Sequence, residues 1–253
     1  MTHLNLTFDN KIVLITGGTS GIGLETARQF VAQGAQVVLT GITEQRLTAA
    51  RREFGNTALV MQADLREPDS LDRVIAEIKA RFGRLDILFA NAGAGTASLL
   101  ESVTASQISE QFSLNFNGAF FAVQKAAPLL GKGASVILTT SFLNRVGTPG
   151  LSILSATKAA VRSLARTLGA ELAPRGIRVN AVSPGPISTP FHGKLGLTDE
   201  QLKETAAGIE ASVPLGRFGE AAEVAKAVLF LASENAAFIT GEELVVDGGL
   251  SQF

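Results

Sequence analysis

Short apolar runs rich in β-branched residues alternate along the chain with segments whose apolar positions recur at helical spacing. The runs predict strands at residues 11–16, 36–40, 58–62, 85–90, 135–140, 178–183 and 243–246. The segments between them predict helices at residues 21–33, 69–82, 105–130 and 221–232. Two more helices are predicted, one that follows the second strand and ends at about residue 54, and one that begins near residue 151 and ends before residue 174. In one of these helices, Leu71, Val74 and Ile78 fall on a single face.

This alternation favours an α/β fold in which helices cover a parallel sheet. No linker, repeat or low-complexity tract interrupts the pattern. We therefore predict a single domain over residues 1–253, a doubly wound sheet of about seven parallel strands flanked by helices on both faces. Ligands of such sheets bind beyond the carboxyl ends of the strands, so the residues that follow each strand are the candidates for chemistry.

Composition narrows the class of protein. Hydrophobic residues make up 46% of the 253 residues and charged residues 18%, which predicts a large core and no long disordered tract. A net charge of −1 provides no field that would attract nucleic acid or an anionic membrane. The chain has no Cys and only two His, so we expect no metal site. We find no signal peptide and no apolar stretch near the ~20 residues of a membrane helix, and therefore expect a cytoplasmic protein.

A glycine-rich segment, TGGTSGIG at residues 16–23, follows the first predicted strand and opens the first predicted helix. Gly17 allows a tight turn, Gly21 lets the backbone approach a pyrophosphate, and Gly23 permits close packing of helix on strand. The helix N-terminus adds free amide hydrogens and the positive end of the helix dipole. An ordinary loop is the alternative, but the strand–turn–helix context favours dinucleotide binding. Further contacts are expected from Thr19, Ser20 and Ile22.

Other short motifs follow the later strands. The third strand leads into ADL at residues 63–65, the fourth into NAG at 91–93, and the sixth into SPGPIST at 183–189. Ser141, position 154 and Lys158 are spaced thirteen and four residues apart. In this order, these motifs resemble the classical short-chain dehydrogenase/reductase family, and the resemblance runs from about residue 8 to 250.

The resemblance implies a Rossmann-type fold with the cofactor and catalytic core in about residues 8–190 and a substrate-covering segment in about 190–215. It also implies that the dinucleotide is bound by residues after successive strands. Besides the glycine-rich turn, those are Gly41, Ile42, Asp64, Leu65, Asn91, Ala92, Gly93, Lys158, Pro184, Gly185, Ile187 and Thr189.

In that family a hydride passes between the nicotinamide and a carbinol or carbonyl carbon, while a Tyr moves the accompanying proton. The resemblance assigns ribose binding and lowering of the Tyr pKa to Lys158, the substrate hydrogen bond to Ser141, and support of the Lys through water to Asn115. The Tyr position holds Leu154, and the chain contains fifteen Phe and no Tyr. The expected catalytic set is therefore Asn115, Ser141, Leu154 and Lys158, without a phenol.

Leu154 cannot donate a proton. A positioned general acid contributes roughly 10²–10⁴-fold in rate, or about 3–5 kcal/mol of barrier. Cofactor and substrate alignment would survive its loss, so we predict impaired reduction rather than none. Substitute donors are Ser141, Ser152, Ser155, His192 or a water held by Lys158. Ser155 points about 100° away from Leu154 around a helix and is a poor replacement.

The choice of dinucleotide depends on the end of the second strand. An acid there would bind the ribose hydroxyls of NAD and repel a 2′-phosphate. The chain has Gly41 and Ile42 instead, which favours NADP(H) over NAD(H). The Arg that many NADP users carry at the position of Ile42 is missing, and Arg46 in the next helix either reaches the phosphate or is a solvated helix charge.

Three functions remain open. The first is NADP(H)-linked interconversion of a ketone and a secondary alcohol, impaired or rewired by Leu154. The second is a pseudoenzyme or sensor that binds the dinucleotide, and the third is a lyase or isomerase that reuses the cleft. Apolar residues on the substrate side predict an apolar carbonyl or alcohol substrate; they are Phe142, Leu143, Val146, Leu151, Phe191 and Leu195. The resemblance implies a homotetramer that pairs the helices 105–130 and 151–173 and the C-terminal strands.

Overall fold

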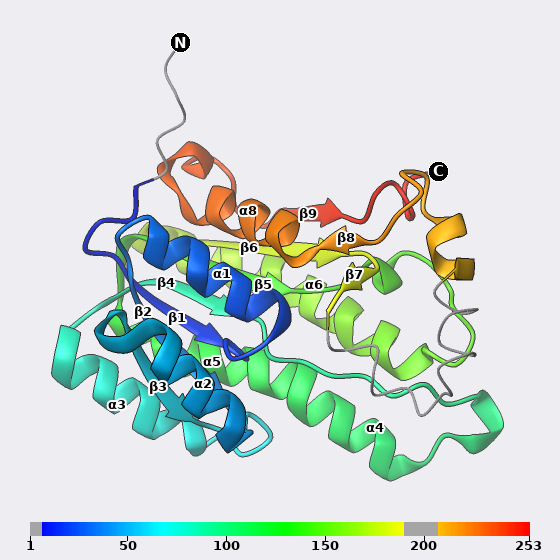
Figure 1. Cartoon of the computed structure of the whole chain (residues 1–253), viewed down its shortest axis with the longest axis horizontal. Helices are drawn as coiled ribbons and strands as arrows, with labels where there is room; N and C mark the ends of the chain where they lie inside the picture. The colour runs from blue at the N-terminus through cyan, green and yellow to red at the C-terminus, as the bar shows by residue number, and fades with distance from the viewer. Residues whose placement is uncertain (1–6, 190–206) are drawn as a thin grey trace.

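A central parallel sheet with helices on both sides forms the molecule (Figure 1). The computed structural model describes residues 7–189 and 207–253. The sheet strands are β1 (Ile12–Thr16), β2 (Gln36–Gly41), β3 (Ala58–Gln62), β4 (Leu85–Ala90), β5 (Leu130–Thr139), β6 (Arg178–Pro184) and β9 (Glu243–Val246). Their order is β3-β2-β1-β4-β5-β6-β9, and every neighbouring pair is parallel. The predicted Rossmann-type sheet of about seven strands is confirmed.

The helices divide into two layers. They are α1 (Gly21–Ala32), α2 (Glu44–Phe54), α3 (Ser70–Phe82), α4 (Ala105–Phe112), α5 (Gly118–Ala126), α6 (Ser152–Leu172) and α8 (Ala221–Ala232). Buried residues of α3, α5 and α6 share one core with one face of the sheet, whereas those of α1, α2 and α8 share a second core with the other face. Alternate β1 side chains serve the two cores, since Leu14 belongs to the first and Val13 and Ile15 to the second.

Short helical turns join several of these elements. They are η1 (Gly55–Thr57), η2 (Leu100–Ser102), η3 (Ser113–Asn117), η4 (Ala127–Leu129), η5 (Phe142–Asn144), η6 (Ala173–Arg175) and η8 (Glu234–Ala236). A second, two-stranded parallel sheet pairs β7 (Ile187–Ser188) with β8 (Gly219–Glu220). The sequence pattern did not predict this small sheet, because two-residue strands carry no periodicity.

The helix predicted over residues 105–130 is observed as one helical run over residues 105–129, which changes type along its length. The π-helical turn η3 separates α4 from α5, and α5 ends at Ala126, before the turn η4 that contains Pro128. Proline cannot supply the amide that continues an α-helix, so the chain leaves the helix and β5 begins at Leu130, earlier than predicted. The π-helical turn places Asn115 in the interior, as described below.

The strand order positions the site. β1 and β4 are neighbours in the sheet. From β1 the chain adds β2 and β3 on one side, and from β4 it adds β5 and β6 on the other side. A crevice forms at such a switch point, outside the carboxyl ends of the strands.

Within residues 7–189 and 207–253, no helix is long and apolar enough to cross a membrane.

Candidate active site

The glycine-rich turn between β1 and α1 lies close against neighbouring backbone. Gly17 has a φ of +65°, and a Cβ on it would lie 3.0 Å from the Cα of Ala92. A Cβ on Gly23 would lie 2.5 Å from the carbonyl oxygen of Gly17. A Cβ on Gly21 has the Thr189 side chain as its nearest described neighbour, at 3.5 Å. The turn is therefore closed toward the protein at Gly17 and Gly23 and more open at Gly21, as a close approach by a pyrophosphate requires.

The N-terminus of α1 is not capped by its own side chain. Ser20 precedes the helix in an extended conformation and makes no capping hydrogen bond. The first amides of α1 therefore remain available to an anion. Ile22, in the first turn, packs against the core on the α1 side of the sheet.

A guanidinium group lies beside this turn. Arg46, a half-buried residue of α2, donates from Nη1 to the Ser20 Oγ at 3.3 Å. The end of β2 approaches the turn just as closely, since a Cβ on Gly41 would lie 2.4 Å from the Thr19 Oγ1. Ile42 is 53% exposed. The Arg46 guanidinium therefore lies beside the glycine-rich turn.

A cavity of about 550 Å³ lies beyond the ends of β2 and β3. Its lining is Ile42, Gln62, Ala63, Asp64, Glu67, Asp69, Ser70 and Arg73. The Asp64 carboxylate accepts from Arg66 at 2.6 Å and 3.0 Å, and these hydrogen bonds hold the pKa of Asp64 below its ordinary value. Leu65 is buried in the core, where a Cβ on Gly118 would lie 3.0 Å from its Cβ. Asp64 thus lines the cavity, whereas the Leu65 side chain does not.

Asn91 joins the ends of β1 and β4. The backbone amides of Asn91 and Ala92 both donate to the Thr16 Oγ1, at 3.0 Å and 3.1 Å. The Asn91 Nδ2 donates to the Thr16 carbonyl oxygen at 3.2 Å. The asparagine side chain therefore holds the switch point together, beside the glycine-rich turn.

Asn115 sits in the π-helical turn and is buried. Its Oδ1 accepts from the amide of Ala94 at 3.0 Å, and its Nδ2 donates to the Ala94 carbonyl oxygen at 2.9 Å and to the Thr157 Oγ1 at 3.1 Å. Thr157 in turn donates to the Leu154 carbonyl oxygen at 2.8 Å. Asn115 therefore ties the segment after β4 to the helix α6 that carries positions 154 and 158.

Lys158 presents its ammonium group at the carboxyl end of β5. Its Nζ donates to the Thr139 carbonyl oxygen at 2.9 Å. A Cβ on Gly93 would lie 3.2 Å from this Nζ and 3.0 Å from the Asn115 Oδ1. Gly93, Asn115 and Lys158 therefore meet at one point. The side chain is buried, and burial lowers the pKa of Lys158 from 10.5 to about 8.

Leu154 lies one helical turn before Lys158 on α6 and is also buried. Its methyl groups contact the segment after β4, where a Cβ on Gly95 would lie 2.6 Å from the Leu154 Cδ2. The side chain therefore fills the space between α6 and the segment after β4 with an apolar surface. It carries no group that can exchange a proton.

Ser141 follows β5 and begins η5. Its Oγ accepts from the Leu143 amide at 3.3 Å, and the residue is half-buried. Leu143 itself is buried.

The segment after β6 crosses back toward the glycine-rich turn. The Gly185 amide donates to the Val246 carbonyl oxygen at 2.9 Å, and Pro184 pairs with Val246. Ile187 is buried and pairs with Gly219. Thr189 is the nearest described neighbour of a Cβ on Gly21, as noted above. The predicted cofactor segments therefore converge from β1, β4 and β6.

Buried hydroxyl groups at the carboxyl ends of three strands fit the same location. The Oγ1 atoms of Thr40 and Thr139 and the Oγ of Ser183 have no hydrogen-bond partner within the described residues. Unpaired buried polar atoms are uncommon in folded proteins. The glycine cradle and the uncapped helix fit a bound dinucleotide, and these buried hydroxyls lie at the same edge of the sheet.

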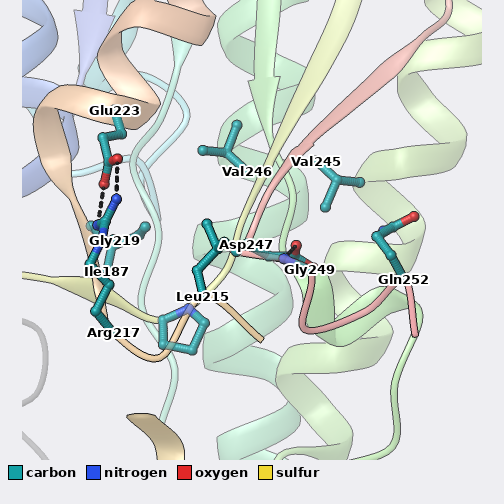
Figure 2. Close-up of a pocket in the computed structure, with 12 residues that line it drawn as sticks. Ile187, Leu215, Arg217, Gly219, Glu223, Val245, Val246, Asp247, Gly249 and Gln252 are labelled. Atoms are coloured by element: carbon teal, nitrogen blue, oxygen red, sulfur yellow. Dashed lines mark hydrogen bonds and ion pairs between the residues drawn. The ribbon is translucent and has the colours of Figure 1, made fainter. Parts of the chain in front are cut away.

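A second cavity, of about 440 Å³, lies between the ends of β6 and β9 and the start of α8 (Figure 2). An ion pair between Arg217 and Glu223 stands at one side of it, with Nη2 and Oε1 2.7 Å apart. Of the predicted site residues, Ile187 lines this cavity. His192, Phe191, Leu195 and the greater part of the predicted covering segment lie outside the described residues.

Several residues that support the predicted site carry no recognisable sequence signal. Thr16, Gly95 and Thr157 hold the neighbours of predicted residues in place, as described above. Their contacts join residues 42 to 76 positions apart, or depend on the shape of a loop. The resemblance named the residues expected to touch ligands, but no local pattern marked these supports.

Known proteins resemble this chain over nearly its whole length. A family model described as Enoyl-(Acyl carrier protein) reductase matches residues 17–251. Oxidoreductase asL5 of Sarocladium schorii is 40% identical over 244 residues, which cover 96% of this chain and 96% of asL5. The 3-oxoacyl-[acyl-carrier-protein] reductase FabG of Thermotoga maritima is 34% identical over 247 residues, which cover 96% of this chain and 98% of FabG.

A solved structure agrees with these relatives. A short-chain dehydrogenase/reductase from Serratia marcescens superposes with a TM-score of 0.89 at 29% identity, covering 96% of this chain and 99% of that one. The family model and these relatives identify an oxidoreductase class. The chain belongs to the classical short-chain dehydrogenase/reductase family, whose members use NAD(H) or NADP(H).

Proposed function

We propose that this chain is an oxidoreductase that interconverts a ketone and a secondary alcohol with NADP(H), and that Leu154 impairs or reroutes its proton transfer. The observation that carries the proposal is the meeting of Lys158, Asn115 and Gly93 at the carboxyl edge of the sheet. The glycine-rich turn opens at the same edge. FabG, a relative named as a 3-oxoacyl reductase, acts on a ketone, which supports a carbonyl substrate.

Each residue of the cleft has a separate task in this proposal. A bound nicotinamide would supply or accept the hydride. The Lys158 ammonium would bind the ribose hydroxyls, while Ser141 would donate a hydrogen bond to the substrate oxygen. Asn115 would fix the Ala94 backbone relative to α6. Leu154 offers only an apolar wall beside Gly95, so the proton has to come from another group or from water.

The preference for NADP(H) rests on Arg46. Its guanidinium reaches Ser20 at the glycine-rich turn, close to where β2 ends. Guanidinium groups bind phosphate oxygens with strong, charge-assisted hydrogen bonds. The cavity beyond β2 and β3 would take the adenine, with Asp64 at its wall. A 2′-phosphate would then lie between this cavity and Arg46.

The proposal also assigns roles to two segments of the chain, a cellular location and an oligomeric state. Residues 8–190 would form the cofactor and catalytic core and residues 190–215 would cover an apolar carbonyl or alcohol. The protein would act in the cytoplasm as a homotetramer. Exposed apolar side chains around the start of α4 support such an association, and they are Leu99, Leu100 and Ile108.

A dinucleotide-binding sensor without turnover is the second candidate, and Leu154 is the observation that favours it. NADPH binding by calorimetry, followed by NADPH consumption over a panel of ketones and aldehydes, distinguishes the two. Carbonyl-dependent loss of NADPH absorbance supports the oxidoreductase. NADPH binding without turnover on any carbonyl supports the sensor, and absence of NADPH binding contradicts both.

A further inference from the structure

A buried carboxylate lies at the start of β9, outside the set of residues discussed so far. Glu243 is 4% exposed. Its Oε1 accepts from the Thr140 Oγ1 at 2.6 Å and from the Asn144 Nδ2 at 2.7 Å. Its Oε2 lies 3.3 Å from the Arg145 Nη2 and 3.6 Å from the Arg162 Nε. One carboxylate on β9 thus contacts the residue that follows β5, the turn η5 with the residue after it, and α6.

Three of these four partners flank Ser141. Thr140 immediately precedes it, and Asn144 and Arg145 follow within one turn of η5. We name residues 140–146 the Ser141 loop. Glu243 therefore holds the loop on both sides of the serine, from a strand about 100 residues away in the sequence. The fourth partner, Arg162, comes from the helix that also carries Lys158.

Stability alone does not explain such an arrangement. Moving the Glu243 carboxylate and the Arg162 guanidinium out of water costs free energy that their attraction only partly offsets. Apolar side chains of similar volume would pack at this place without that cost. The charged cluster instead fixes the orientation of the groups that it joins, because hydrogen bonds and ion pairs require defined geometry and apolar contacts do not.

We infer that Glu243 is a positioning residue that holds the Ser141 loop against the sheet and so sets the place of the Ser141 hydroxyl relative to Lys158. Glu243 touches neither residue directly. It acts through Thr140, Asn144 and Arg145. The mechanical part of this inference stands on the contacts alone, while its catalytic consequence rests on the proposed oxidoreductase function.

The mechanical part is tested by hydrogen–deuterium exchange on the whole protein. In Glu243→Gln the ion pairs with both arginines are lost, and we expect the amides of the Ser141 loop to exchange at least tenfold faster. Arg145→Gln is a milder second variant, because this arginine is 40% exposed. Its loss leaves the buried Glu243 carboxylate paired with Arg162. Glu77→Gln, which breaks an exposed ion pair with Arg81 on α3, is the matched control and should leave the loop unchanged.

The catalytic consequence is measured in the Leu154→Tyr background, which supplies the missing phenol. We expect Glu243→Gln to lower kcat by about 10- to 100-fold, as small misplacements of reacting groups do, and to change the KM for NADPH less than twofold. A merely structural role would move both parameters and raise exchange in the glycine-rich turn as well.

Three outcomes decide the inference. Faster exchange confined to the Ser141 loop, with kcat lowered and NADPH binding kept, supports it. Unchanged loop exchange in both variants overturns it, as does a uniform rise across the chain with loss of NADPH binding. If the Leu154→Tyr background turns over no carbonyl at all, the proposed function fails, and the exchange data still decide the mechanical part.

Discussion

Replacing Lys158 by Met should stabilise the protein at neutral pH, because the folded chain holds this ammonium group in its interior. Burial lowers the pKa of Lys158 from 10.5 to about 8. At about 1.36 kcal/mol per pKa unit, this difference of about 2.5 corresponds to a cost of about 3 kcal/mol for keeping the charged form buried. Loss of the donor to the Thr139 carbonyl oxygen offsets about 1 kcal/mol of the gain.

The pH dependence separates this effect from ordinary packing. Between pH 8 and 10.5 the unfolded chain binds more protons at Lys158 than the folded chain does, so the stability of the unmodified protein rises with pH in that window. Below about pH 8 Lys158 is protonated in both the folded and the unfolded chain, so the full free-energy cost of burying its charge applies. The Met variant should therefore be more stable by about 2 kcal/mol at pH 7 and by close to zero at pH 9.5.

Urea unfolding without dinucleotide, at pH 7 and pH 9.5, measures this difference. Lys226→Met, which removes an exposed lysine on α8, is the control and should change the free energy of unfolding little at either pH. The same Lys158→Met variant should bind NADPH more weakly, because the ribose loses its ammonium partner. A gain that is equal at both pH values, or a loss at pH 7, would refute the assignment of a buried, destabilised charge to Lys158.

Two further predictions concern the dinucleotide. Gly23→Ala should weaken NADPH binding more than tenfold, since its Cβ would lie 2.5 Å from the Gly17 carbonyl oxygen, whereas Gly131→Ala, where a Cβ meets nothing within 4 Å, should not. Calorimetric titration measures both, and equal affinities would contradict the assigned role of the turn. Arg46→Ala should weaken NADPH binding about tenfold and NADH binding less than twofold, with Arg52→Ala as the control. An equal effect on the two dinucleotides would remove the case for NADP(H).

Local pattern was enough to predict the sheet, because each buried strand reads as an apolar run between turn signals. The predicted strand at 85–90 coincides with β4, and the glycine spacing identified the turn where a Cβ would clash. The π-helical turn at 113–117 was missed. Over five residues, the spacing of apolar positions in a π-helical turn is hard to tell from that of an α-helix.

The support of the site could not be predicted in this way. Glu243 reaches Thr140 across 103 positions, and nothing in the sequence around either residue marks the pair. Arg46 likewise became informative only when α2 was placed beside Ser20. Contacts of this kind depend on the packed fold, so the sequence motifs named residues expected to touch ligands but not the residues that hold them in place.

The most direct test of the central claim compares NADPH consumption by this chain and by Leu154→Tyr over one panel of ketones and aldehydes. In the proposed function the site lacks only a proton donor, so restoring the phenol should raise the rate on at least one carbonyl by about 10² or more. NADPH affinity should stay within twofold, which confines the gain to chemistry. If the unmodified chain is already fast and the Tyr variant gains nothing, another group carries the proton and the assigned deficiency at Leu154 is wrong.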